Sequence, residues 1–139
     1  MDITYFGKQE GPDPHVVSIR HANGNVTFLK QRIWQHSLTG FSWGYGGSGP
    51  ADLALNMLYD YLLRTKIKGA RRLALDLHQG FKWHFIATQP KDLSVNSEQI
   101  ELWLKGSSEL QRLTESAGDQ CEKKITKSLT ISRGNVWEP

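Results

Sequence analysis

Residues 36–55 read HSLTGFSWGYGGSGPADLAL, and this stretch decides the fold. It combines the aromatic residues Phe41, Trp43 and Tyr45 with a run of glycines and the start of a helix. Glycine loses more conformational freedom on folding than any other residue, so several glycines together require a geometric reason. We interpret them as allowing a tight, partly left-handed approach to the helix while the three aromatic rings pack around it. The stretch therefore indicates shape more than chemistry.

The residues that follow predict a helix over 50–66. Proline fits the first helical position because no amide partner is needed there, and Asp52 would lie in the first turn, where the helix dipole favours an anion. Spacings of three and four predict a buried apolar stripe of Ala51, Ala54, Leu55, Leu58 and Leu62. The opposite face carries Asp52, Asn56, Asp60 and Arg64. An Asp60–Arg64 pair on that face would contribute about 0.3 kcal/mol.

The residues before this stretch predict a small antiparallel sheet. Residues 3–6 are β-prone, and residues 7–14 contain the turn chemistry of Gly11-Pro12-Asp13-Pro14. Residues 15–20 and 26–29 form a hairpin, because Asn23-Gly24 between them tolerates positive φ. Residues 30–37 fit either an extension of the strand or a short helical turn.

The second half of the chain predicts further helices. Residues 70–88 fit a helix by one pattern and a strand by another, and the length of the segment favours a helix that Pro90 ends. Ser97 is expected to begin another helix and Gly106 to end it; residues 128–131 are β-prone. The fold class is therefore α+β, a small antiparallel sheet that includes the N-terminal hairpin and packs against two or three helices.

Composition indicates one soluble domain. The 139 residues are 38% hydrophobic, with a formal net charge of +3 and a pI of about 9.1. This mild basicity permits contact with nucleic acid without requiring it. Cys121 is the single cysteine, which excludes an intramolecular disulfide and a cysteine-based zinc site and fits a reducing cytosol. With neither a signal-like leader nor an apolar run of membrane-spanning length, we expect a cytoplasmic protein.

Residues 40–55, GFSWGYGGSGPADLAL, resemble the signature of an uncharacterised domain-of-unknown-function family. Its short members come from bacteria, archaea and phages and typically show hSPxGFEWGYGGSGPAxLALAIL. Residues 78–87, HQGFKWHFIA, are similar to its YQxFKWEVIA-type segment, and residues 99–104, QIELWL, to its EIxxWL. The resemblance covers roughly residues 3–105. It implies one domain over residues 1–105 and a C-terminal extension over 106–139, packed on that domain or trailing from it.

The chain departs from the family pattern at three places. Leu38 stands where proline is usual, Ser42 where glutamate is usual, and residues 78–80 where a tyrosine and no glycine are usual. The glutamate missing at position 42 argues against a catalytic carboxylate there. Because the family has no assigned activity, the resemblance implies fold and soluble character but no mechanism.

A nucleotide or anion cradle is the alternative interpretation of the glycine run. Amides at a helix N-terminus attract anions, and the ligand site would consist of Trp43, Tyr45, Gly46, Gly47, Ser48 and Gly49. However, Pro50 removes one amide and Asp52 places a negative charge beside the site. No lysine follows the glycines, so the run is not a P-loop. Ser48 is instead expected to satisfy amides at the helix start.

We expect no catalytic residue, no metal site and no cofactor. His78 and His84 are six positions apart, which is not the i, i+4 spacing of a metal-binding pair. His36 is expected to cap or hydrogen-bond the turn before the signature. Ser48 lies outside a G-x-S-x-G nucleophile motif, and Cys121 has no histidine near it in sequence.

Two features suggest contact with a macromolecule. The basic cluster of Lys66, Lys68, Arg71 and Arg72 could meet a phosphate backbone, and Lys123, Lys124 and Lys127 form a looser basic group. Exposed tryptophans mark interfaces, and we expect partial exposure among Trp34, Trp83, Trp103 and Trp137. The candidate partner contacts are therefore the basic cluster together with Trp83 and Trp103.

The sequence favours a small, soluble, non-enzymatic interaction protein of prokaryotic or mobile-element origin that binds a macromolecular partner, most simply a protein. An inhibitor of a host-defence complex is one form, implied only by the phage members of the similar family. The alternatives are a nucleotide- or anion-binding module that uses the glycine run and a nucleic-acid-binding protein that uses the basic cluster. A hydrolase is the least supported class, because no nucleophile–base set is visible.

Overall fold

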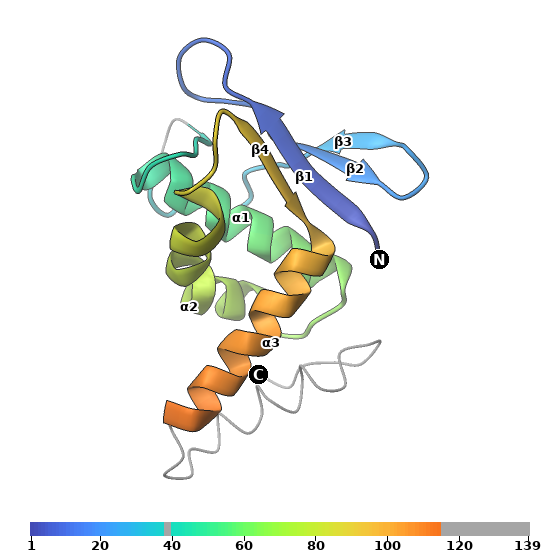
Figure 1. Ribbon diagram of the computed structural model, residues 1–139, viewed down its shortest axis with the longest axis vertical. Helices are drawn as coiled ribbons and strands as arrows, with labels where there is room; N and C mark the ends of the chain where they lie inside the picture. The colour runs from blue at the N-terminus through green and yellow to red at the C-terminus, as the bar shows by residue number, and fades with distance from the viewer. Residues whose placement is uncertain (38–39, 115–139) are drawn as a thin grey trace.

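The computed structural model describes residues 1–37 and 40–114 and has an α+β fold, which confirms the predicted class. Its elements are β1 (Ile3–Lys8), β2 (Ser18–His21), β3 (Val26–Phe28), α1 (Ser48–Arg64), α2 (Ala70–Phe81), the π-helix η1 (Lys82–Ile86), β4 (Asp92–Asn96) and α3 (Ser97–Thr114). Figure 1 shows the sheet on one side of the molecule, α1 beside it, and α3 running on from the end of β4.

The four strands form an antiparallel sheet in the order β3-β2-β1-β4. The predicted hairpin is confirmed as β2 and β3. Gly24 at its tip has a φ of 90°, and the Asn25 amide donates to Asn23 Oδ1 over 3.0 Å. β4, which the sequence did not predict, pairs with β1 so that Val95 lies opposite Tyr5.

Alternation divides the sheet into two faces. The inner face packs into the core through Ile3, Tyr5, Ile19, Leu93 and Val95, all buried. Tyr5 ties this face to α1 because its hydroxyl donates to Asp60 Oδ2 over 2.7 Å. Burial, and then the Asp60 carboxylate, raise the pKa of Tyr5 well above its usual value. The alternate residues on the outer face are only partly buried or exposed.

The polar stripe of α1 is buried, in contrast to its expected position opposite the buried face. Asp52, Asn56 and Asp60 are all within the core. Asn56 Oδ1 accepts the amides of Arg32 and Ile33, at 2.7 and 3.0 Å. The predicted ion pair is present: Arg64 Nε donates to Asp60 Oδ2 over 2.7 Å.

Asp52 and Asn56 explain why residues 30–37 adopt neither of the two predicted forms. The Asp52 carboxylate accepts the backbone amides of Gln35, His36 and Ser37 at 2.9 to 3.2 Å. A buried amide needs a partner, and here side chains of α1 supply what a strand or helical turn would otherwise provide. The segment is therefore held in an irregular path across the helix.

The start of α1 differs from the prediction by two residues. Gly47 is the N-cap and Ser48 the first helical residue, with no side-chain cap hydrogen bond. Ser48 therefore does not satisfy the first amides, and Asp52 lies beyond the first turn. The Asp52 carboxylate instead accepts hydrogen bonds from the backbone amides of residues 35–37. These bonds, rather than an interaction with the helix dipole, hold the side chain in place.

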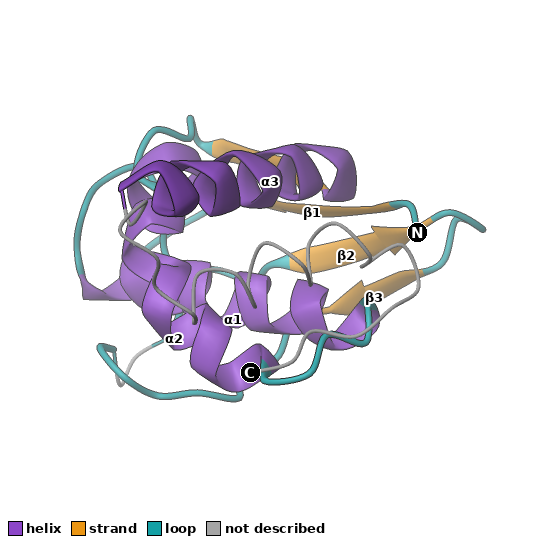
Figure 2. Cartoon of the chain, turned by 90° about the horizontal axis from the view of Figure 1, so that it is seen from below, coloured by secondary structure: helices purple, strands orange, loops and turns teal. Residues whose placement is uncertain are grey.

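Residues 70–86 are helical, as their length suggested, but the last five form a π-helix. The helix prediction at Ser97 is confirmed, whereas Gly106 lies inside α3 and does not end it. A glycine inside a helix lowers its stability by only about 1 kcal/mol, so a single glycine does not have to end it. In Figure 2, the view from below, α3 is seen above α1 and α2. The division of the chain at residue 105 remains a prediction.

Candidate functional site

The glycine run serves as a packing surface for aromatic rings. A Cβ added at Gly46 would lie 2.2 Å from the Trp83 ring, and one at Gly47 would lie 2.5 Å from the Tyr45 ring. Gly44 has a φ of 90°, which L side chains rarely adopt. These contacts support the interpretation that the glycines shape the backbone, because any side chain there would displace a ring.

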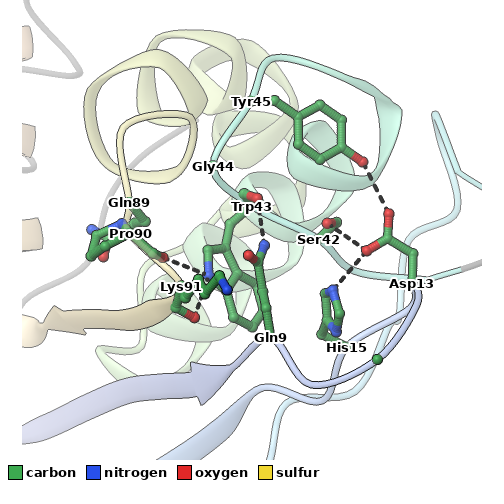
Figure 3. Close-up of a pocket in the computed structure, with 11 residues that line it drawn as sticks. Gln9, Asp13, His15, Ser42, Trp43, Gly44, Tyr45, Gln89, Pro90 and Lys91 are labelled. Carbon is green, nitrogen blue, oxygen red and sulfur yellow. Dashed lines mark hydrogen bonds and ion pairs between the residues drawn. The ribbon is translucent and has the colours of Figure 1, made fainter.

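Beside this run lies a polar pocket of about 630 Å³ (Figure 3). Three segments enclose it: the loop after β1, the signature stretch, and the linker before β4. Its lining residues are Gln9, Gly11, Asp13, His15, Ser42, Trp43, Gly44, Tyr45, Gln89, Pro90 and Lys91. Of the sequence-predicted ligand residues, the pocket therefore contains Trp43 and Tyr45.

The Asp13 carboxylate is the hydrogen-bonding centre of the pocket (Figure 3). Its Oδ1 accepts from His15 Nε2 over 2.7 Å and from the Ser42 hydroxyl over 2.9 Å. Its Oδ2 accepts from the Tyr45 hydroxyl over 3.3 Å. The Asp13 side chain is 48% exposed and that of His15 only 5%, so a ligand would meet the carboxylate rather than the imidazole.

Trp43 forms the inner wall and connects the three segments. The side chain is buried, and its indole Nε1 donates to the carbonyl oxygens of Pro90 and Lys91, at 3.0 and 3.2 Å. Its own carbonyl accepts from Gln9 Nε2 over 2.7 Å. The His15 ring packs against the indole with 5.4 Å between ring centroids. The wall is thus fixed on both of its flanks.

This arrangement limits the chemistry of the pocket. Ser42 donates to Asp13 and not to a histidine, so the three side chains do not form the nucleophile–base relay of a serine hydrolase. A partly exposed carboxylate favours hydrogen-bond donors and cations and opposes phosphate. The alternative hypothesis, that the glycine run binds a nucleotide or anion, is therefore not supported by the carboxylate-centred pocket beside it.

The other predicted ligand residues lie along the adjoining helix start. Gly46, Gly47 and Ser48 follow Tyr45 into α1. The Gly49 backbone packs on Ser42, because a Cβ added at Gly49 would lie 3.1 Å from the Ser42 Cβ. Sequence reasoning missed Gln9, Asp13 and His15. The only signal was the Gly11-Pro12-Asp13-Pro14 turn, which indicated a loop but not that the loop folds back onto the signature stretch.

The predicted partner contacts fall into two separate places. Lys66, Lys68, Arg71 and Arg72 are exposed around the turn between α1 and α2, with Arg72 3.3 Å from Asp76. Trp83 and Trp103 lie at the other end of α2. Trp83 lies eleven positions after Arg72, which is about 16 Å along a helix axis.

The two tryptophans differ in their surroundings. Trp83 is exposed and covers Gly46, with the Lys82 ammonium 4.4 Å from its ring. Trp103 is partly buried edge-on to Phe81, with 5.4 Å between ring centroids. Trp34 is also exposed, as expected. Trp137, Cys121, residues 128–131 and the looser basic group of Lys123, Lys124 and Lys127 lie outside the described residues.

The side chains of His36 and His78 are in contact, although the two residues are 42 positions apart in the sequence. Their Nε2 atoms are 2.9 Å apart, and His78 Nδ1 is 2.8 Å from the Leu75 carbonyl oxygen. Burial lowers the pKa of His78 from its usual value. The His36 ring therefore bonds a side chain of α2 and not the turn before the signature, where it was expected. Within residues 1–37 and 40–114, no group of three or more acidic, histidine or cysteine residues could hold a metal ion.

Comparison with known proteins places the chain in a family without assigning it an activity. Over the described part of the chain, none of the helices has the length and apolar character needed to cross a membrane. No curated protein matches the chain, and no solved structure matches it. The model of a family of unknown function, DUF6166, matches residues 5–106, close to the extent predicted from the sequence motifs. The chain therefore belongs to the family of unknown function DUF6166.

Proposed function

We propose that this chain is a non-catalytic binding protein that docks a protein partner on the outer face of its sheet, over the β2–β3 hairpin. The observation that carries the proposal is the exposure of three large apolar side chains there. Val16 is 64% exposed, Val26 52% and Phe28 67%. Single exposed apolar residues are ordinary, whereas a group of them on one face marks an interaction site.

The register of the sheet places Val26 and Phe28 on one face, and Val16 lies two positions before β2. Val26 lies opposite Arg20 and Phe28 opposite Ser18, so all four share the outer face. Arg20 in turn lies opposite Thr4, and its guanidinium stacks 4.4 Å from the centre of the Phe6 ring. Aromatic, aliphatic and arginine side chains in one patch are the composition of protein interfaces.

The edge of the sheet adds a backbone component to this surface. β3 is a terminal strand and, among the described residues, pairs with β2 alone. An edge strand can accept a further strand through its outward amides and carbonyls. A partner segment that extends the sheet at β3 would therefore cover Val26 and Phe28 as well.

Affinity purification from the source cells, with matched variants, tests this proposal. Val26→Ser combined with Phe28→Ser should remove a partner that the unaltered chain retains in stoichiometric amount. Leu102→Ser, a substitution at a similarly exposed residue of α3, is the control and should retain it. Equal recovery of that protein with both variants, or no stoichiometric partner of the unaltered chain, would count against the proposal.

Nucleic-acid binding is the second candidate function. All four side chains of the basic cluster are exposed, and they lie close together in the turn between α1 and α2 and at the start of α2. Phosphate contacts of this kind weaken steeply as salt rises. Gel retardation with the Lys66→Glu/Arg71→Glu variant tests it. Retardation that charge reversal leaves unchanged would exclude the basic cluster as a phosphate-binding surface.

A further inference from the structure

We propose that His36 and His78 form a binding site for one divalent transition-metal cation of the Zn²⁺ class. The ligands would be the two imidazole Nε2 atoms, with water completing the coordination shell. The site is separate from the Asp13 pocket and from the outer face of the sheet. It brings the segment before the signature stretch onto α2, across 42 positions of sequence.

The two imidazole rings converge on one point between the segment before the signature stretch and α2. Their Nε2 atoms are 2.9 Å apart and the ring centroids 5.1 Å. Two imidazoles on a tetrahedral zinc ion, with Zn–N bonds of about 2.05 Å, have nitrogens about 3.3 Å apart and centroids about 5.2 Å apart. The centroid separation already matches, so tilting the rings would be enough to admit the ion.

The tautomer of His78 suits a metal ligand. The Leu75 carbonyl can only accept a hydrogen bond, so His78 Nδ1 carries the hydrogen and Nε2 presents its lone pair toward His36. A ring nitrogen bonded to a backbone carbonyl while the other faces the metal is the usual support of a histidine ligand.

The main chain at His36 is held in place by hydrogen bonds to Asp52. Its backbone amide is held by both oxygens of the buried Asp52 carboxylate, at 3.0 and 3.1 Å, and the Ser37 amide by one of them at 2.9 Å. The main chain is therefore fixed while the His36 ring reaches solvent, where water can fill the open positions. Asp52 also contributes a negative charge that favours a cation beside His78.

Besides the tilt of the rings, binding of the cation requires only a change of tautomer at His36. In the metal-free pair His36 Nε2 must donate to His78 Nε2, so His36 carries its hydrogen on Nε2. When the cation binds, that hydrogen moves through solvent to His36 Nδ1, and both Nε2 lone pairs face the metal. The Gln79 amide, 3.4 Å from His78 Nε2, is the other described polar side chain bonded to the pair.

Calorimetric titration of the full chain with Zn²⁺ at pH 7.5 tests this site. We expect one cation whose affinity falls about tenfold or more in His36→Ala and in His78→Gln. His21→Ala removes a half-buried histidine whose ring bonds Thr27 Oγ1, and the variant should bind zinc as the unaltered chain does. Zinc held elsewhere, for example at Cys121, would persist in every variant.

The His36→Ala variant makes the test decisive even if His78→Gln fails to fold, because His36 is exposed. As a second readout, Cu²⁺ bound to the unaltered chain should show two equivalent nitrogens by electron paramagnetic resonance, and one in His36→Ala. Equal zinc affinity in the unaltered chain and His36→Ala, including no measurable binding by either, would mean that the pair is a hydrogen bond only.

Discussion

Asp52 shows what a single buried carboxylate does in this chain. It accepts hydrogen bonds from the amides of Gln35, His36 and Ser37 and from the Gln31 side chain. Its spacing with Asn56 and Asp60 predicted a shared helix face, but nothing in the local pattern showed that residues 30–37 would cover that face. Hydrogen bonds to a charged group are among the strongest that folding forms.

Asp52→Asn should therefore lower the free energy of unfolding by about 3 kcal/mol, because the amide presents one acceptor oxygen in place of two. Urea denaturation measures the change. Asp76→Asn is the control: Asp76 is exposed, and its replacement should alter stability by no more than about 0.5 kcal/mol. Equal effects of the two substitutions would contradict the assigned role of Asp52.

Gly46 tests the packing interpretation of the glycine run. Gly46→Ala places a methyl group against the Trp83 ring and should destabilise the fold by about 1 kcal/mol, because the ring has to move. In the Trp83→Ala background the same substitution should have almost no effect, so the two changes couple in a double-mutant cycle. Additive effects would show that the glycine is needed for another reason.

At the scale of elements, the sequence predicted those that local signals specify. The Asn23-Gly24 turn identifies the hairpin, and the length of residues 70–86 identifies a helix. β4 escaped prediction because its alternation, Leu93 and Val95, is short and is stabilised by pairing with β1, nearly ninety positions earlier in the chain. The candidate pocket escaped for the same reason, since loops distant in sequence bring Asp13 to Ser42 and Tyr45.

The inward side of β4 should tolerate little change. Val95→Thr keeps the shape but places a hydroxyl in the core, which should destabilise the fold by about 1 to 2 kcal/mol. Ser94→Thr, on the outward side of the same strand, should be neutral or slightly stabilising. Thermal denaturation compares the two. If the Ser94 substitution proved the more harmful, the assigned faces of the sheet would be wrong.

At the scale of the whole molecule, stability should depend on pH through His78. Its pKa is lowered in the folded state from a usual value of 6.5, so below about that pH the unfolded chain binds more protons. Stability should then fall as pH drops from 7 toward 5, and less steeply in His78→Gln. Urea midpoints across this range measure the difference, and identical slopes for both proteins would contradict it.

The outer face of the β2–β3 hairpin is the proposed binding surface for a protein partner. Site-specific photo-crosslinking in the source cells tests it most directly, with a photoreactive phenylalanine analogue placed at position 28 and, as control, at position 102. We expect a discrete crosslinked species from position 28 that disappears when Val26→Ser and Arg20→Glu are added, and no such species from position 102. No adduct at position 28, or the same adducts from both positions, would contradict it.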